Sequence, residues 1–134
     1  MLYEDITKII LEAGFEVSNE LGIGYLEPVY EKALLIALRQ KSFRAENQAP
    51  LTVKFRGEIV GDFYVDILVE DKVSIELKSA TGLTKENYAQ TINYLKATEI
   101  EVGLLINFGT PKIEYRRLAN KFNENPINVR DVFK

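Results

Sequence analysis

The sequence predicts an α/β fold in which a mixed β-sheet is flanked by α-helices. Two amphipathic helical patterns open the chain, strand patterns separated by short turns follow, and a third helical pattern then lies between two strand patterns. Strands joined by short turns pair antiparallel, whereas a strand reached through a crossover helix usually returns parallel and right-handed. The sheet should therefore be mixed, with helices on at least one face.

Apolar residues recur at helical spacing in three segments. Gly22 should end the first, because glycine readily adopts the left-handed conformation that often follows a helix. Pro28 is tolerated in the first turn of the second, and Thr84 suits the position that caps the third. The predicted helices are residues 6–21, 27–41 and 84–97.

Five segments alternate between apolar and polar residues or form short apolar runs, and these are predicted to be strands. They are residues 51–55, 59–69, 73–78, 102–108 and 113–118. Arg56-Gly57-Glu58 should form a turn, and Gly61 is expected to bend or bulge its strand. Residues 120–134 are polar with little periodicity, so no element is predicted there.

The chain lacks both cysteine and histidine, and these absences exclude several kinds of site. Without cysteine there are no disulfides, thiolate nucleophiles or thiolate metal sites. Without histidine there is no Ser-His-Asp arrangement, no His-ligated zinc and no imidazole general base. A catalytic metal would need oxygen ligands, which favours Mg2+ or Mn2+.

The 134 residues have the ordinary composition of a folded protein, and one domain is predicted over residues 1–134. A net charge of −3 argues against a surface coated in positive charge for nonspecific nucleic-acid binding, but it permits a local basic rim. The first residues do not resemble a signal peptide, and no apolar run approaches membrane-spanning length. A cytoplasmic location away from membranes is therefore expected.

Two carboxylates and a lysine are predicted to meet on the hairpin of the second and third strands. A strand period of two places Glu76 and Lys78 on one face. Residues paired across an antiparallel ladder share a face, so Asp66 joins them if it pairs with Glu76. A three-residue turn at 70–72 gives that pairing, whereas a two-residue turn separates the carboxylates. On the opposite face of the second strand we expect Phe63, Val65, Ile67 and Val69.

This arrangement has a chemical interpretation. Two carboxylates can hold a hard divalent cation while leaving positions open for water and a phosphate oxygen. Lys78 could position or help to deprotonate that water and offset charge on phosphorus. Asp66 supports the interpretation, because an acidic residue within an apolar strand calls for a partner or a function. The alternatives are an ordinary surface Glu-x-Lys or a purely structural network of ion pairs.

The same residues resemble a known family. Asp66 with Glu76-Leu-Lys78 resembles the core motif of the PD-(D/E)XK nuclease superfamily, and Gly24-Tyr-Leu-Glu27-Pro-Val-Tyr30 is similar to the signature of its GxxExxY branch. The resemblance runs from the first helix to residue 109. It implies a restriction-endonuclease-like architecture and a nuclease that uses Mg2+ or Mn2+ to hydrolyse DNA or, as a second choice, RNA.

The resemblance also implies roles for individual residues. Asp66 and Glu76 would be metal ligands, the Leu77 carbonyl a backbone ligand, and Lys78 the catalytic lysine. Glu27 would reach the metal directly or through water. The alternative for Glu27 is a carboxylate that the dipole favours at the beginning of a helix.

Three further residues have roles to consider. Tyr30 is interpreted as a core residue or hydrogen-bond anchor. Gln90 and Tyr94 have the Gln-x-x-x-Tyr spacing of some exonuclease-like members of the superfamily, and residues four apart share a helical face. We expect Gln90 to contact DNA or phosphate and Tyr94 to pack against the hairpin. The alternative is an ordinary exposed glutamine beside a half-buried tyrosine.

The chain departs from the family pattern at three positions. Val65 precedes the aspartate in place of proline, and Ser18 and Asn87 stand where typical GxxExxY members carry histidines. Any metal or phosphate role of those histidines therefore has no counterpart here, whereas the hairpin residues are intact.

The same observations suggest possible partners of the protein and an alternative function. Two copies of one site can cut two strands, so a homodimer is a further hypothesis. The alternative function is a catalytically inactive module that binds nucleic acid or protein. The basic residues available for a rim are Lys54, Arg56, Lys85, Lys96, Arg116 and Arg117.

Overall fold

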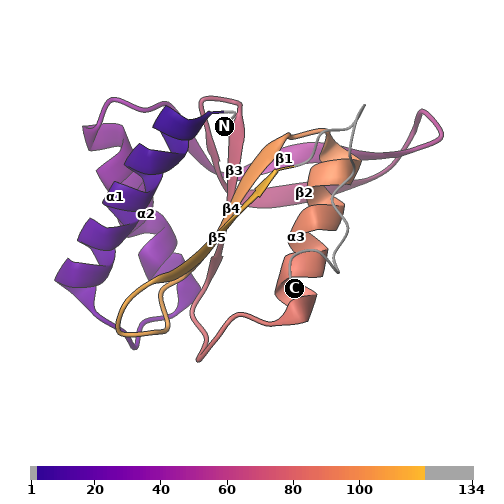
Figure 1. Cartoon of the computed structure of the whole chain (residues 1–134). Coiled ribbons are helices and arrows are strands. Elements are labelled where there is room, and N and C mark those ends of the chain that lie inside the picture. Colours follow the sequence, from indigo (N-terminus) through magenta and orange to yellow (C-terminus); the bar gives the residue numbers. More distant parts are fainter. Residues whose placement is uncertain (1–2, 120–134) are drawn as a thin grey trace.

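The protein is a layered α/β structure, known from a computed structural model that describes residues 3–119 (Figure 1). Its helices are α1 (Glu4–Leu21), α2 (Glu27–Gln40) and α3 (Lys85–Thr98). Its strands are β1 (Ala45–Phe55), β2 (Glu58–Val69), β3 (Val73–Lys78), β4 (Val102–Asn107) and β5 (Glu114–Ala119). No element is predicted for residues 120–134, and these residues lie outside the described range.

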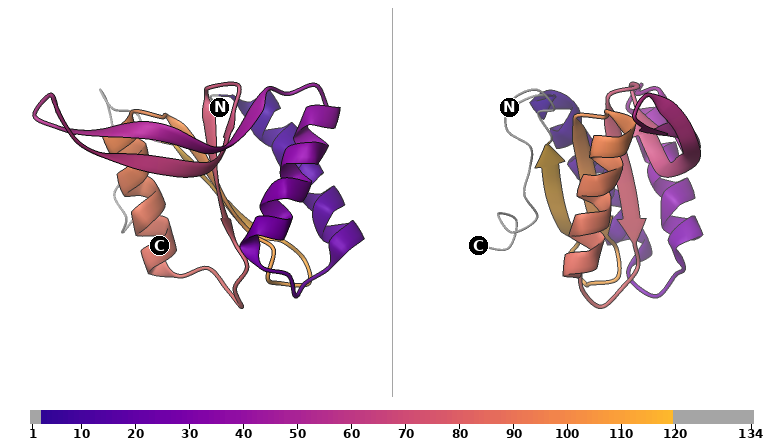
Figure 2. Two further views of the ribbon diagram at one scale, coloured as in Figure 1. Left: turned by 180° about the vertical axis from the view of Figure 1, so that it is seen from behind. Right: turned by 90° about the vertical axis from the view of Figure 1, so that its right-hand side faces the viewer.

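All five strands form one sheet in the order β1-β2-β3-β4-β5. The pair β3–β4 is parallel, because α3 connects these strands, and the other three pairs are antiparallel. Helices α1 and α2 cover one face of the sheet and α3 covers the other (Figures 1 and 2). The predicted mixed sheet with flanking helices is therefore confirmed.

The main core lies between the sheet and helices α1 and α2. Ile10, Leu34, Ile75 and Leu104 are among its fully buried members. On α2, Tyr30 and Leu35 are buried, whereas Val29 remains 40% exposed.

Helix α3 covers the opposite face of the sheet with a smaller cluster that includes Ile92 and Leu95. The helix begins with a capping box at Thr84, the residue predicted to cap it. The Thr84 hydroxyl accepts from the Asn87 N–H, and the Asn87 side chain accepts from the Thr84 N–H. This reciprocal pair satisfies two of the backbone donors left free at the first turn.

Strand β1 is longer than predicted, because it begins at Ala45 and not at residue 51. The additional residues include Glu46, Asn47, Gln48 and Pro50, whose polarity and proline are typical of a loop. However, β1 is an edge strand paired only to β2. An edge strand tolerates proline and solvent-facing polar side chains because one side of its ladder is free.

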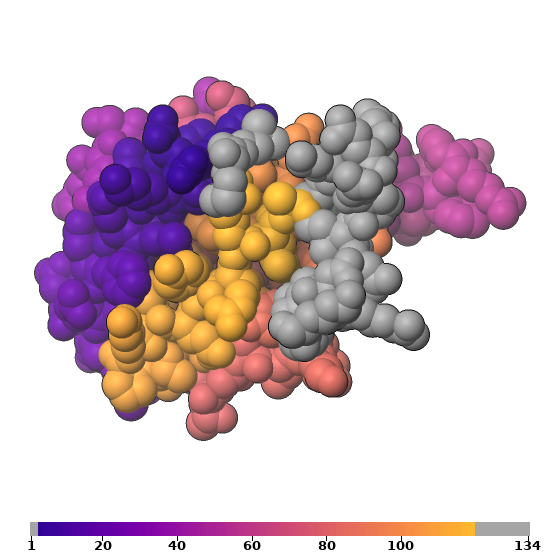
Figure 3. Space-filling view, in the orientation of Figure 1, coloured from indigo at the N-terminus to yellow at the C-terminus, as the bar shows by residue number. Residues whose placement is uncertain are grey.

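The β1–β2 hairpin projects past α3 as an arm (Figures 2 and 3). Its turn is shorter than predicted, because Phe55 pairs with Glu58 around two residues, Arg56 and Gly57, which both have positive φ. The predicted irregularity near Gly61 is confirmed, since the register shifts between the Val53–Gly61 pair and the next pair. The shift leaves one extra residue on β2, as in a β-bulge.

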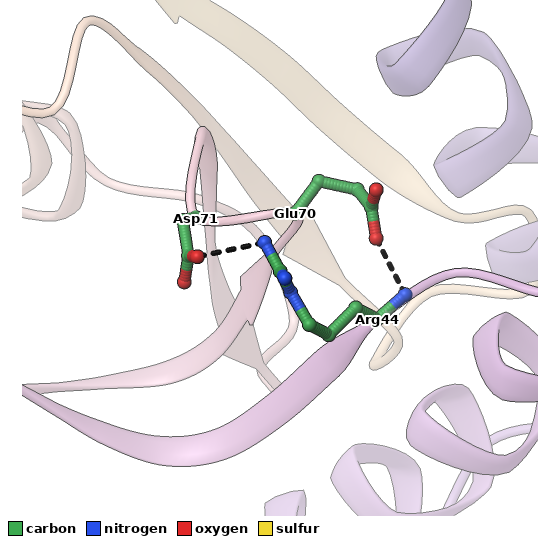
Figure 4. A network of polar contacts seen from close by, with 3 residues as sticks. All are labelled: Arg44, Glu70 and Asp71. Atoms are coloured by element: carbon green, nitrogen blue, oxygen red, sulfur yellow. Dashed lines mark hydrogen bonds and ion pairs between the residues drawn. The ribbon is translucent and has the colours of Figure 1, made fainter.

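The turn between β2 and β3 has the predicted length of three residues, since Val69 pairs with Val73. Glu70 and Asp71 have φ of 53° and 56°. Arg44 holds both, because its N–H donates to the Glu70 carboxylate at 2.6 Å and its guanidinium contacts Asp71 at 2.7 Å (Figure 4). The ion pair is exposed, so it contributes little stability and mainly ties the turn to the beginning of β1.

Candidate active site on the β2–β3 hairpin

Asp66 lies where the ladder between β2 and β3 ends. The paired residues run from Val69–Val73 to Ile67–Ile75, so the predicted backbone pair Asp66–Glu76 does not form. The Asp66 carboxylate instead accepts the Leu77 N–H at 2.8 Å. The predicted turn and register are therefore correct. Beyond the last ladder pair, however, the Asp66 side chain and not the backbone of β2 makes the hydrogen bond to β3. This contact still draws Asp66 toward the strand that carries Glu76.

The apolar alternation of β2 breaks at Asp66. Phe63 stacks on Tyr94 of α3, with ring centroids 3.6 Å apart, whereas Ile67 and Val69 belong to the core under α1 and α2. The expectation that these residues share one face is therefore wrong. The strand opposite is also irregular at this point, because Gln48 has φ of 50°.

Glu76 is the most electrostatically perturbed residue of the site. Its Oε1 atom is buried and has no hydrogen-bond partner. Burial, followed by the negative charge of Asp66, raises the pKa of Glu76 from 4.5 to about 8, while the positive charge of Lys78 opposes the increase. Asp66, Glu76 and Lys78 therefore lie close enough to act on one another, and the fold brings together the three residues predicted from the hairpin.

The residues present fit a hard divalent cation. A partly buried pair of carboxylates with an unsatisfied oxygen can accept a cation, and oxygen ligands are those that Mg2+ and Mn2+ prefer. Asp66 and Glu76 would supply these ligands. Among residues 3–119 no cluster of three or more acidic side chains is arranged to hold a metal.

Two residues near the site escaped the sequence analysis. The Gln48 amide donates to Glu31 of α2 at 2.7 Å and to Asp66 at 3.3 Å. Gln48 thus connects the hairpin carboxylate to the helix across from it. Glu31 could have been found, since it lies four residues after Glu27 on the same helical face. Gln48 gave no such signal, because it lies in a stretch that resembles a loop.

The two helical residues of the Gly-x-x-Glu-x-x-Tyr segment have different positions. Glu27 is exposed in the first turn of α2 and lines a groove next to Ser79, which follows Lys78 in the chain. Tyr30 is fully buried, and its hydroxyl donates to the Gly22 carbonyl at 2.6 Å and accepts from the Tyr25 N–H at 3.3 Å. The interpretation of Tyr30 as a hydrogen-bond anchor is confirmed.

Gln90 and Tyr94 form a pair on α3. The Gln90 amide donates to the Tyr94 hydroxyl at 2.8 Å, and Tyr94 in turn stacks on Phe63 of β2. The predicted packing of Tyr94 against the hairpin is confirmed. Gln90 is exposed, and its predicted contact with nucleic acid stays a prediction.

Asn107 holds the segment that follows Lys78. This fully buried side chain accepts from the N–H groups of Ala80 and Gly109, and it donates to the Ala80 carbonyl and to Glu114. Four hydrogen bonds use the full capacity of one amide. The end of β3 is therefore fixed to β4 and β5.

Replacing Gly109 with alanine should destabilise the protein by about 1–3 kcal/mol or more, as overpacking of a filled site does. A Cβ atom at Gly109 would overlap the Ala80 backbone, which Asn107 holds in place. Urea unfolding would measure the loss. Gly61→Ala is the matched control, because a Cβ there meets no atom within 4 Å. Equal stability of the two variants would contradict the close packing at Gly109.

Comparison with known proteins places the chain in a family. The model of the PD-(D/E)XK nuclease superfamily matches residues 4–118, and the chain therefore belongs to this superfamily. Its mixed sheet and flanking helices are those of a restriction-endonuclease-like fold.

A solved structure supports the same fold. The crystal structure of SSO0001 matches with a TM-score of 0.55 and 18% sequence identity, over 97% of this chain and 63% of that chain. The present chain thus spans less than two thirds of that protein. No curated protein sequence matches the chain. Within residues 3–119, no helix has both the length and the apolar character needed to cross a membrane.

Proposed function

We propose that the protein is a metal-dependent nuclease of the GxxExxY branch that hydrolyses phosphodiester bonds in DNA. One observation carries the proposal: the buried, unpartnered Oε1 of Glu76 lies beside Asp66 and Lys78. A structural ion pair would be expected to satisfy that oxygen, because leaving a buried acceptor unpaired costs about 1–3 kcal/mol. In a cation-binding site, this oxygen would be free to bind the ion.

The proposed roles combine what the family resemblance implies with the contacts of these residues. Asp66 and Glu76 would hold Mg2+ or Mn2+, with the Leu77 carbonyl as a backbone ligand and Glu27 reaching the ion directly or through water. When bound, the ion supplies Lewis acidity toward a phosphate oxygen and lowers the pKa of water. Lys78 would donate hydrogen bonds to the charge that develops on the phosphate oxygens. Gln48 and Glu31 would keep the Asp66 carboxylate in one orientation.

A local basic region supports nucleic acid as the substrate. Lys54 of the arm and Lys96 of α3 line one cavity of about 430 Å3 together with Thr52, Thr98 and a single acidic residue, Glu99. Ammonium and hydroxyl groups are the donors that commonly contact phosphate oxygens. The net charge of −3 is thus compatible with a restricted phosphate-binding region, and Gln90 would add an amide contact on the same helix.

Cleavage should depend on a divalent metal. Purified protein with Mg2+ or Mn2+ is expected to cut DNA, and EDTA should abolish the reaction because the carboxylates alone cannot activate water at neutral pH. Labelled single-stranded, double-stranded and branched DNA, with RNA of matched sequence, would identify the substrate. Metal-dependent binding without cleavage on any of them would favour a catalytically inactive nucleic-acid-binding module instead.

A further inference from the structure

An open groove lies next to the candidate active site. Its volume is about 680 Å3. One side is formed by the α1–α2 connection and the beginning of α2, and the other by the segment after β3 together with Gly109. The residues that line it are Ile23, Gly24, Tyr25, Leu26, Glu27, Pro28, Ser79, Ala80, Thr81 and Gly109.

Hydrogen bonds from buried side chains fix the backbone on both sides of the groove. The buried Tyr30 hydroxyl binds the backbone of Gly22 and Tyr25 on one side, and the buried Asn107 amide binds the backbone of Ala80 on the other. The Ser79 hydroxyl joins the two sides by donating to the Tyr25 carbonyl at 2.8 Å. The groove is therefore preformed, as small-ligand sites usually are.

The groove lies next to the candidate active site. Ser79, which lines one side of the groove, directly follows Lys78 in the chain. On the other side, Glu27 lies one helical turn before Glu31, which Gln48 connects to Asp66. A chain bound at the carboxylates can thus extend along α2 into the groove.

The chemistry of the lining favours a neutral aromatic group over a phosphate. The lining contains the Glu27 carboxylate but no lysine or arginine, so a phosphate would meet repulsion. Tyr25 is 47% exposed and Leu26 is 79% exposed, and they offer apolar and aromatic surface. Stacking on an aromatic side chain contributes about 1–3 kcal/mol per base, and a carboxylate can accept a hydrogen bond from a base amino group.

We propose that this groove binds an unpaired nucleobase of the strand whose phosphodiester lies at Asp66, Glu76 and Lys78. The inference rests on the proposed nuclease function and narrows its substrate to single-stranded or frayed nucleic acid. Tyr25 provides the stacking surface for this base. A paired base cannot enter, because its amino group and its ring faces are occupied within the duplex.

Binding without cleavage tests the proposal. The probe is a single-stranded DNA oligonucleotide carrying 2-aminopurine, mixed with wild-type protein in EDTA and compared with the same strand in a duplex. The single strand should bind at least about tenfold more tightly, with a change in 2-aminopurine fluorescence on stacking. Tyr25→Leu should weaken its binding by about 5- to 150-fold, the equivalent of the stacking energy of one base. Tyr115→Leu, on β5, is the control and should bind like wild type.

Each other outcome has a defined meaning. Equal affinity for single strand and duplex, or unchanged binding by Tyr25→Leu, would overturn the groove proposal. So would a wild-type dimer that Leu26→Ser converts to a monomer in sedimentation while strand binding stays the same, because the groove would then be a protein interface. Tyr25-dependent binding by a protein that cuts no substrate would instead overturn the nuclease function and leave the groove assignment standing.

Discussion

Lys78→Ala protein should cleave its substrate about 10²- to 10⁴-fold more slowly than wild type, the range found when a group that transfers protons or stabilises transition-state charge is removed. Lys78 is the cation whose charge acts on Glu76 at the end of β3. Cleavage of a labelled oligonucleotide at saturating Mg2+ would measure the loss.

Lys72→Ala is the matched control for this experiment. Lys72 lies in the β2–β3 turn, at the opposite end of the same strand, and is exposed. This variant should cleave at the wild-type rate. Thermal unfolding of both variants would separate loss of catalysis from loss of fold. Full cleavage by a folded Lys78→Ala protein would exclude the assigned role of the lysine.

The metal-free protein should become less stable as the pH rises from about 4.5 to about 8. The pKa of Glu76 is 4.5 in the unfolded reference and about 8 in the folded protein, so the folded state retains a proton that the unfolded state releases in this range. The associated stability is fully present below pH 4.5 and is lost as the pH approaches 8. With 1.36 kcal/mol per pKa unit, the loss is roughly 3–5 kcal/mol.

Glu76→Gln is the test of this dependence, because glutamine has a similar shape and does not titrate. Urea unfolding in EDTA at pH 5, 6.5 and 8 should show a much smaller decrease for the variant, which should exceed wild type in stability at pH 8. Added Mg2+ should stabilise wild type at pH 8 by about 2.7 kcal/mol at a concentration of 100 Kd. It should stabilise the variant less. Parallel pH profiles for the two proteins would refute the assignment of the titrating group.

Local pattern was sufficient to predict much of the fold and the central part of the site. The length of the turn at 70–72 sets the register of β2 against β3, and the period of a strand sets which residues of β3 share a face with Glu76. Both depend on neighbours in the chain, so the approach of Asp66, Glu76 and Lys78 was predictable. The cap at Thr84 is local for the same reason.

Other features were decided by contacts between distant segments. Residues 45–50 resemble a loop, and they become strand only because an edge position accepts their proline and polar side chains. The alternation of β2 reverses near Asp66 because Phe63 packs on α3 while Ile67 packs under α1 and α2. No periodicity within β2 indicates which helix each residue will meet.

The sequence alone thus identified the hairpin residues and the chemistry that the absence of histidine and cysteine leaves open. Only the tertiary structure revealed that Gln48 connects Glu31 to Asp66, that Glu76 has a buried oxygen without a partner, and that a preformed groove adjoins the site. The physical reason is the distance along the chain over which each kind of interaction acts. Turn length and strand period act over a few residues, whereas burial and the packing of α2 against β1 depend on segments that meet only in the folded chain.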